Sequence, residues 1–364
     1  MTVASGGEVA GVDIRYRGDR GHVVSGSVSD GGKSLSSYAW RNITLTNTVN
    51  GAVQSDAYFI HRGESGAKFA IYGVADGEYE ITARWVLDAN EEVFASTSRR
   101  VVVKGADVGG VELKLSPMGS IAGKFALEAM PGVCESKRKW SIEEALLALR
   151  YEAKPREATQ ARSQTIVNGL SEKGEFTAYN LTANHYFLEP RLPNENWYVK
   201  AITAPASTST PGRAARSSLQ ADIARNGITL KTGEKVAGVT VTIADGASGM
   251  SGKVVPATEG ARPPARLRIH LVPAEAGNAN DVLRYAEAFS RNDGAFSLSN
   301  IAPGKYWLIA RAAPDEEMSD NSPAPIAWDA NERAKLRHEA MAAKNEIELQ
   351  PCGRMKDYVL RFDR

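Results

Sequence analysis

One sequence pattern occurs three times in the chain, as KFAIYGVADGEYEITAR (68–84), EFTAYNLTANHYFLEPR (175–191) and AFSLSNIAPGKYWLIAR (295–311). Each copy has a phenylalanine ten residues before a tyrosine, an aliphatic residue midway between them and an arginine at its end. The matched columns are Phe69, Phe176 and Phe296; Val74, Leu181 and Ile301; Tyr79, Tyr186 and Tyr306; and Arg84, Arg191 and Arg311. Self-similarity of this kind indicates a tandem repeat of one structural unit.

Two further strings also occur once in each unit. The strings that open each unit are GSVSD (26–30), GKFAL (123–127) and GKVVP (252–256). The strings that close each unit are VVVKGADVGGVELKL (101–115), ITLKTGEKVAGVTVTI (228–243) and IELQPCGRMKDYVLRF (347–362). Each closing string has two alternating apolar runs around a glycine-bearing turn, which is typical of a β-hairpin or of two successive strands.

The repeat unit is about 110 to 130 residues long and would hold about seven short strands separated by turns. We therefore predict an all-β fold of three tandem Greek-key β-sandwich modules. Residues 7–16, GEVAGVDIRY, match the end of a closing string rather than the beginning of a unit. We accordingly expect the chain to be the C-terminal part of a longer protein. The expected division is 1–20 as trailing strands of an upstream module, then modules at 21–117, 118–245 and 246–364.

The segment 141–151 is ambiguous on its own. Ser141 and Glu144 form a capping-box pattern before an apolar run, which favours a helix. The repeat argues otherwise, because Leu149 precedes its phenylalanine by 27 residues, as Ile269 does in the third unit within the alternating string RLRIHLV. We predict a strand at 146–151, with a helical turn at 141–145.

One short helix is expected inside the third unit, at about 330–343. The string ANERAKLRHEAMAA is rich in good helix formers and follows Asp329, a suitable N-cap residue.

The conserved spacing inside the repeat also predicts the roles of single columns. The repeated phenylalanines and tyrosines lie at alternating strand positions and are expected to fill each core. Gly77, Asn184 and Gly304 precede the tyrosines by two residues, and glycine and asparagine best tolerate a positive φ. We predict one left-handed turn position there. The repeated arginines either cover an adjacent face with their aliphatic stems or form a row that binds a ligand.

The combination of opening, central and closing strings resembles the carboxypeptidase regulatory-like module. RNDGAFSLSNIAPGKYWLIAR (291–311) fits it best, the second unit has Ala183-Asn184 in place of the usual Pro-Gly, and the first keeps Asp76-Gly77. The resemblance covers nearly the whole chain. It implies a transthyretin-like sandwich, grouped with carbohydrate-binding-like folds, and an extracytoplasmic bacterial location: periplasmic, outer-membrane-associated or secreted. It implies no catalytic residues, because the module itself has none.

Composition and motifs exclude several classes of function. The net charge is +1, which removes the general attraction to phosphates that nucleic-acid binding needs. No apolar run reaches the length of a membrane span. The first residues, MTVASGGEVAG, have neither a basic n-region nor an apolar h-region, so we expect no signal peptide in this chain. His338-Glu339 begins like a zinc-binding H-E-x-x-H motif, but Ala342 stands where the second histidine would be. We predict no enzyme activity, no metal site and no cofactor.

Trp197 and Trp328 are the candidate ligand-binding residues, because each lies beside asparagine and acidic residues in a loop-like context. Two coplanar, solvent-facing rings would favour a module that binds glycans. Rings packed between modules would favour a structural spacer or a segment that binds other surface proteins. A third alternative is an accessory region of a peptidase.

The chain has two cysteines, Cys134 and Cys352, which are too few for a disulfide scaffold. The sequence leaves open whether they are free thiols or form a disulfide, as an oxidising compartment permits. Because they belong to different units, such a bond would join the second module to the third.

Overall fold

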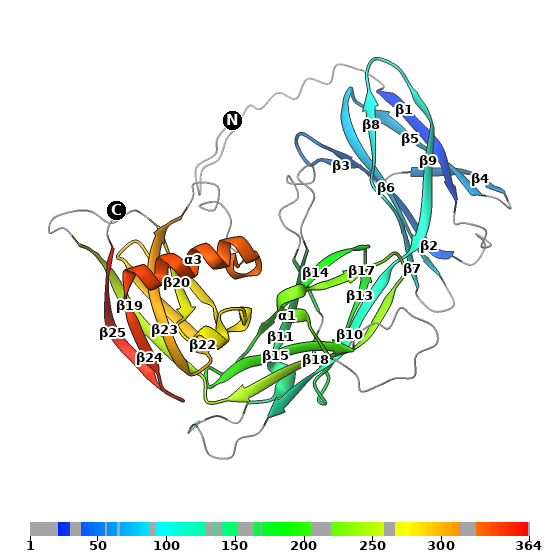
Figure 1. Ribbon diagram of the computed structural model, residues 1–364. Coiled ribbons are helices and arrows are strands. Elements are labelled where there is room, and N and C mark those ends of the chain that lie inside the picture. The colour runs from blue at the N-terminus through cyan, green and yellow to red at the C-terminus, as the bar shows by residue number, and fades with distance from the viewer. Residues whose placement is uncertain are drawn as a thin grey trace. The chain divides into compact units, whose positions relative to one another are not determined.

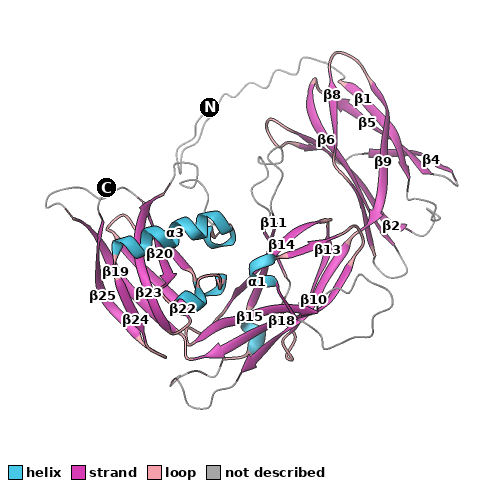
Figure 2. Cartoon of the chain, in the orientation of Figure 1, coloured by secondary structure: helices cyan, strands magenta, loops and turns pink. Residues whose placement is uncertain are grey.

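A computed structural model describes residues 21–29, 38–54, 57–63, 66–87, 92–128, 134, 138, 140–151, 164–167, 169–205, 220–257, 266–313 and 325–362. The chain divides into two compact units, Met1–Met118 and Gly119–Arg364. Both units are built mainly of β-strands, as predicted (Figure 1, Figure 2). The trailing strands expected at 1–20 lie outside the described residues.

The first unit holds one sandwich, here called the first sandwich. Its strands are β1 (His22–Ser29), β2 (Tyr38–Asn47), β3 (Val53–Gln54), β4 (Ala57–Gly63), β5 (Gly66–Val74), β6 (Gly77–Leu87), β7 (Val93–Ser96), β8 (Arg99–Val103) and β9 (Val108–Pro117). They form one sheet in the order β3-β2-β6-β7-β9-β1-β5-β4, with β8 beside β6. The sheet doubles over where β9 passes from β1 to β7, because both halves contribute to one core that includes Val24, Phe69, Ile81 and Leu113.

The second unit begins with the second sandwich. Its elements are β10 (Gly119–Glu128), η2 (Ile142–Glu144), β11 (Leu146–Tyr151), β12 (Gln164–Ile166), β13 (Glu175–Leu181), β14 (Asn184–Arg191), β15 (Trp197–Pro205), β16 (Gln220–Asp222), α1 (Ile223–Asn226), β17 (Ile228–Leu230) and β18 (Lys235–Asp245). One sheet has the order β13-β10-β18-β15-β16 and the other β12-β11-β14-β17. A single core cluster lies between them, around Ile121, Phe176 and Val241.

The third sandwich completes the second unit. Its elements are β19 (Ser248–Pro256), β20 (Leu267–Pro273), η3 (Ala276–Asn278), η4 (Val282–Arg284), β21 (Ala286–Phe289), β22 (Ala295–Ile301), β23 (Gly304–Ala312), η5 (Ile326–Trp328), α3 (Ala330–Ala343), β24 (Glu346–Leu349) and β25 (Arg354–Phe362). Its sheets have the orders β22-β19-β25 and β21-β20-β23-β24. Met250, Ile269 and Phe296 belong to the core between them.

The local predictions for 141–151 and 330–343 are confirmed. The strand β11 spans Leu146–Tyr151 and follows the one-turn helix η2. The helix α3 spans Ala330–Ala343, and the carboxylate of Asp329 accepts the backbone N–H groups of Asn331 and Glu332 at 2.8 and 2.9 Å. The closing strings are two successive strands and not hairpins, since in the second and third sandwiches the two strands lie in different sheets.

The repeated aromatic side chains fill the cores, as predicted. All six are buried, with exposed fractions between 0 and 7% for Phe69, Phe176, Phe296, Tyr79, Tyr186 and Tyr306. Each tyrosine hydroxyl also donates to the backbone carbonyl four residues before it, at 2.6 to 2.9 Å. Burial raises the pKa of Tyr306 to about 12, so its hydroxyl stays a hydrogen-bond donor at ordinary pH.

The predicted left-handed position is wrong for two of its three residues. Neither Gly77 nor Asn184 has a positive φ, although Gly304 has a φ of 150°. The residues with left-handed φ in all three repeats lie four residues earlier: Gly73 (73°), Asn180 (60°) and Asn300 (57°). There a β-bulge places two residues of β5, β13 or β22 opposite one residue of the first strand of the sandwich. The bulge residue, and not the turn, therefore requires glycine or asparagine.

A close backbone approach explains the glycine that opens each unit. Gly26, Gly123 and Gly252 lie on the first strand of each sandwich, which runs parallel to the last strand. A Cβ atom on these glycines would lie 1.8 to 2.2 Å from a carbonyl oxygen of the last strand. That strand also bulges here, because its register against the first strand shifts at this point. The repeated glycine is thus a steric requirement of the fold.

Candidate functional site

The two candidate tryptophans are packed and do not form an open platform. Trp197 is 6% exposed and belongs to the core of the second sandwich. Trp328, from the third sandwich, is half-buried, and its ring stacks on Phe187 of β14 with centroids 4.4 Å apart and planes 11° apart. The guanidinium of Arg150 lies 5.9 Å from the same ring. Of the two arrangements that the sequence leaves open, packed rings favour the structural spacer.

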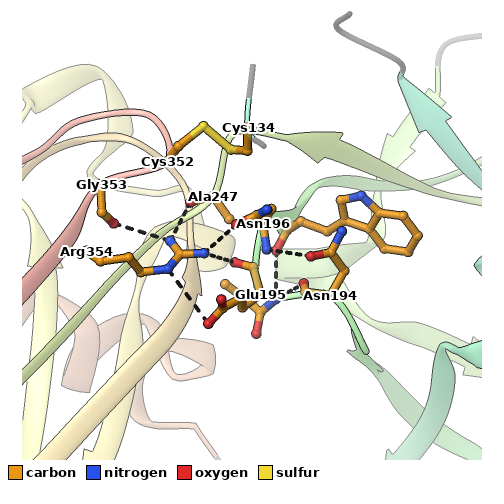
Figure 3. A network of polar contacts seen from close by, with 10 residues as sticks. Cys134, Asn194, Glu195, Asn196, Ala247, Cys352, Gly353 and Arg354 are labelled. Carbon is orange, nitrogen blue, oxygen red and sulfur yellow. Dashed lines mark hydrogen bonds and ion pairs between the residues drawn. A yellow bond between two sulfur atoms is a disulfide. The ribbon is translucent and has the colours of Figure 1, made fainter. Parts of the chain in front are cut away.

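Polar contacts connect the second sandwich to the third at a joint between them. We define this joint as the loop 194–197 that precedes and begins β15, the link 246–247 between β18 and β19, the bulge residue Asn300 and the turn 350–354 that begins β25. Its polar contacts are shown in Figure 3. On the apolar side, Val282 is 7% exposed and Leu283 is partly buried, and both pack against the core of the second sandwich.

Arg354 is the most connected side chain of the joint (Figure 3). Its guanidinium donates to the carbonyl oxygens of Ala247 at 2.9 Å and Gly353 at 3.2 Å. It also donates to the carbonyl oxygen of Glu195 at 3.0 Å and to Oδ1 of Asn196 at 2.6 Å. The carboxylate of Glu195 lies 3.7 Å from Nε. One rigid, planar side chain from the third sandwich therefore fixes the loop of the second sandwich in several directions.

Asn300 binds the same loop from the bulge of β22. Its side-chain amide donates to the carbonyl oxygens of Asn194 and Trp197, both at 2.8 Å. Asn194 is itself 5% exposed, and its Oδ1 accepts the N–H of Asn196 at 2.9 Å. The left-handed backbone of the bulge thus serves the fold, and the asparagine side chain adds a contact to the neighbouring sandwich.

The two cysteines form a disulfide across the joint. The sulfur atoms of Cys134 and Cys352 are 1.97 Å apart, the Cα atoms are 5.5 Å apart, and 218 residues separate them in sequence. The N–H of Cys352 also donates to the carbonyl of Gly246 at 3.2 Å. The question that the sequence left open is therefore answered in favour of a disulfide that joins the second and third sandwiches.

The repeated arginines have different surroundings in the three sandwiches. Arg311 donates twice to the carboxylate of Glu339 on α3, at 2.6 and 2.9 Å, and is half-buried. Arg84 is exposed and lies inside β6, and Arg191 is exposed at the end of β14. Glu339, the acidic residue of the incomplete zinc motif, is thus used to attach the helix. Within the described ranges, no group of three or more histidine, cysteine or acidic side chains is placed to hold a metal ion.

A cavity of about 730 Å³ lies on the third sandwich, away from the joint. It is lined by β19, β22 and β25 and by the residues that follow β21. Its lining includes two cationic residues, Lys253 and Arg291, one carboxylate, Asp357, and two aromatic residues, Phe289 and Tyr358. The three charged side chains are exposed to solvent. The lining therefore combines apolar and aromatic surface with a few charged groups, as ligand pockets commonly do.

Sequence reasoning missed the polar contacts of the joint. Asn300 carries a signal in hindsight, because the column Gly73, Asn180 and Asn300 repeats as glycine or asparagine. Arg354 carries none, because neither of the other closing strings has an arginine in its column.

No protein-family model matches the chain, and no curated protein sequence matches it either. Solved structures do resemble it. The Bacillus anthracis TIE protein is 11% identical over 93% of this chain, with a TM-score of 0.21, and the chain spans 51% of its length. BcpA, the major pilin subunit of Bacillus cereus, is 12% identical over 94% of this chain and 99% of its own, with a TM-score of 0.21. The major pilin protein T-13 of Streptococcus pyogenes is 10% identical over 62% of this chain and 98% of its own, with a TM-score of 0.22. At these scores the likenesses carry no functional argument.

None of the helices in the described part of the chain is long and apolar enough to cross a membrane.

Proposed function

We propose that this chain is a non-catalytic spacer segment of an extracytoplasmic surface protein, built from three copies of a carboxypeptidase regulatory-like module at 21–117, 118–245 and 246–364. The observation that carries the proposal is the joint between the second and third sandwiches. A disulfide, the guanidinium of Arg354 and the amide of Asn300 hold it together. The disulfide also supports an oxidising compartment outside the cytoplasm.

The physical argument concerns the stiffness of a chain of modules. Consecutive domains move relative to each other unless their interface is large and apolar or is covalently closed. Here a covalent bond and several hydrogen bonds act at the joint, and Val282 and Trp328 of the third sandwich also pack against the second. A stiff joint keeps a fixed distance between whatever the two ends carry, which is what a spacer requires.

A distance measurement tests the stiffness directly. Spin labels attached through unnatural amino acids at Tyr179 and Val359, which are 67% and 58% exposed, report the distance between the second and third sandwiches by pulsed electron resonance. We expect one narrow distance distribution in the natural chain. It should broaden when Cys134→Ser and Cys352→Ser are combined with Arg354→Ala. A broad distribution in the natural chain would rule the spacer out.

Carbohydrate binding is the second candidate function, and the cavity on the third sandwich favours it. Saccharides are bound by hydroxyl, charged and aromatic groups in combination, and Lys253, Arg291, Asp357 and Phe289 supply the last two kinds. Trp328 stays a proposed ligand residue only through the ring face that Phe187 does not cover. Trp197, at 6% exposed, would need the core to open.

A glycan panel with hydrolysis assayed in parallel separates the two functions. If the cavity binds glycans, Lys253→Ala and Arg291→Ala should weaken binding at least about tenfold, the loss expected for a hydrogen bond to a charged group. Lys124→Ala is the matched control, because Lys124 occupies the same column in the second sandwich. Binding that survives both cavity variants but is lost in Trp328→Ala would place the ligand at the tryptophan. The absence of binding to every glycan leaves the spacer, whose partners would be other surface proteins.

A further inference from the structure

The sheet β21-β20-β23-β24 of the third sandwich is covered on both faces. Every residue of β20 is buried, whereas a strand at the surface of a sandwich alternates between buried and exposed positions. Leu267, Ile269 and Leu271 face the core, so Arg268, His270 and Val272 occupy the other face. The helix α3 lies over that face (Figure 1), and its Leu336 and Ala340 form a small apolar cluster with Val272, Trp307 and Ile309.

A cluster of charged side chains lies under this cover. Arg268 is 2% exposed and donates to Oε1 of Glu287 on β21 at 2.6 Å. His270 is 1% exposed, and its Nδ1 lies 3.5 Å from Oε2 of the same carboxylate. On β23, Arg311 binds Glu339 of α3 at 2.6 Å and so connects the cluster to the helix. The backbone register places Arg311 opposite Arg268, and Ile309 opposite His270.

The charges of Arg268, Arg311, Glu287 and Glu339 balance, so a charge on His270 would be uncompensated. Arg268 and Arg311 carry two positive charges, and Glu287 and Glu339 carry two negative ones. Protonation of the imidazole would leave one uncompensated positive charge at a site shielded from water. It would also place an N–H group on Nε2, a buried atom that has no hydrogen-bond partner among the described residues. A buried donor without an acceptor is costly.

Two further arginines of α3 hold the same helix by donating to backbone carbonyls. Arg333 is 3% exposed and donates to the carbonyl of Ala327 at 2.5 Å. Arg337 donates to the carbonyls of Pro273 and Ala274, and its guanidinium lies 5.0 Å from the ring centre of Trp307. Both add positive charge on the helix side, where it opposes a further cation.

The protonation states agree with this geometry. Burial is the largest cause that lowers the pKa of His270, the charges of Arg268 and Arg311 lower it further, and Glu287 opposes them in part. Burial alone would raise the pKa of Glu287, but the bond to His270 and the charge of Arg268 outweigh it and lower the pKa. At neutral pH the imidazole is therefore neutral and the carboxylate is charged.

We propose that α3 is an acid-sensitive cover on the third sandwich, held closed by the neutral imidazole of His270 and loosened when that imidazole is protonated. Loosening would uncover the apolar face around Val272, Trp307 and Ile309 while the sandwich core stays folded. The device is independent of the spacer function, because it lies on the outer face of a sheet and not at the joint.

The direction of the pH effect follows from proton linkage. When the cover is open, His270 takes its ordinary pKa of about 6.5. In the closed state its pKa is lower, so the open state binds the proton better. The stabilisation of the closed state is complete above about pH 6.5 and is lost as the pH falls below it. Between pH 7.5 and pH 5.5 the equilibrium constant for opening should rise by up to about tenfold, the limit that the open-state pKa sets.

Hydrogen–deuterium exchange of the full chain tests the proposal. After correction for the intrinsic pH dependence of exchange, the protection of the α3 amides should fall by up to about tenfold between pH 7.5 and pH 5.5, and that of the core strand β13 should not fall. In His270→Gln, α3 should show no such loss. His338→Gln is the matched control, because His338 is an exposed histidine on α3 itself and should leave the acid effect intact.

Two outcomes would overturn the proposal. One is equal protection of α3 at both pH values in the natural chain, a measurement that does not depend on whether any variant folds. The other is the same acid-dependent loss in His270→Gln as in the natural chain.

Discussion

The same end of the sandwich is built differently in the first and third copies. In the third, the bulge carries Asn300 and the segment after β20 carries Val282, and both contact the second sandwich. In the first, the bulge carries Gly73 beside Tyr72, which is 51% exposed, and Val49 in the turn after β2 is 85% exposed. The comparison teaches that the bulge belongs to the fold, whereas the contact that Asn300 makes with the second sandwich is an addition that Gly73, without a side chain, cannot make.

Removal of the disulfide should give the largest difference in stability loss between the two units. Cys134→Ser combined with Cys352→Ser is expected to lower the free energy of unfolding of the second unit by about 4 kcal/mol, because the closed loop is long. The first unit has no part in the bond and serves as an internal control. Unfolding of both units, followed peptide by peptide by hydrogen exchange in denaturant, measures this. A loss shared equally by the two units would contradict the comparison.

Replacement of the opening glycine by alanine should destabilise the first and third sandwiches to the same extent. Gly26→Ala and Gly252→Ala each place a Cβ atom against a carbonyl oxygen of the last strand. Each should destabilise its own sandwich by about 3 kcal/mol, which denaturant unfolding measures. Gly277→Ala is the control, since nothing lies within 4 Å of its Cβ position and its φ is not positive. A harmless substitution at Gly252 would show that the parallel strand can move away.

The substitution Asn300→Gly should make the third sandwich resemble the first at this position. The left-handed backbone is kept, and two hydrogen bonds to the loop of the second sandwich are lost. We expect a loss of about 1 to 2 kcal/mol in the stability of the joint, seen as a lower midpoint of unfolding of the second unit. Asn180→Gly makes the same exchange at the equivalent bulge of the second sandwich. An equal effect of both would mean that the backbone alone matters.

The smallest effect is expected for the tyrosine hydroxyls. Tyr79→Phe and Tyr306→Phe each remove one hydrogen bond to a carbonyl four residues earlier. Each should cost about 1 kcal/mol of its own sandwich's stability in thermal or denaturant unfolding. Tyr306→Phe should lower stability more than Tyr79→Phe, because Tyr306 is fully buried while Tyr79 is 7% exposed. The reverse order would show that burial does not set the cost.

The repeat allowed the fold to be predicted because its signals are periodic. Alternating apolar residues, turn residues and the column of phenylalanines depend on local backbone geometry, which is the same in every copy. The helix at 330–343 carries its own capping signal in Asp329. The predicted left-handed position lies in the turn after the strand, whereas the observed one lies in a bulge inside the strand. A bulge and a turn favour the same residue types, so composition does not distinguish them.

The joint could not be predicted because its contacts belong to one pair of sandwiches only. Arg354 reaches carbonyl oxygens at Ala247 and Glu195, and any residue has a carbonyl, so the sequence carries no trace of the pairing. The tryptophans were singled out by polar neighbours in sequence. Trp328, however, lies against Phe187, which comes from another sandwich. Contacts between distant segments leave no mark in local composition.

The parallel pairing of the first and last strands has a mechanical consequence. In each sandwich the chain enters on one of these strands and leaves on the other, as β19 and β25 do in the third. Because the two strands run in the same direction, entry and exit lie at opposite ends of the pair. A pull on the chain then slides one strand along the other and strains the whole row of hydrogen bonds together. A force on the chain therefore loads each sandwich in shear. In this geometry the hydrogen bonds between the two strands must break together and not one after another.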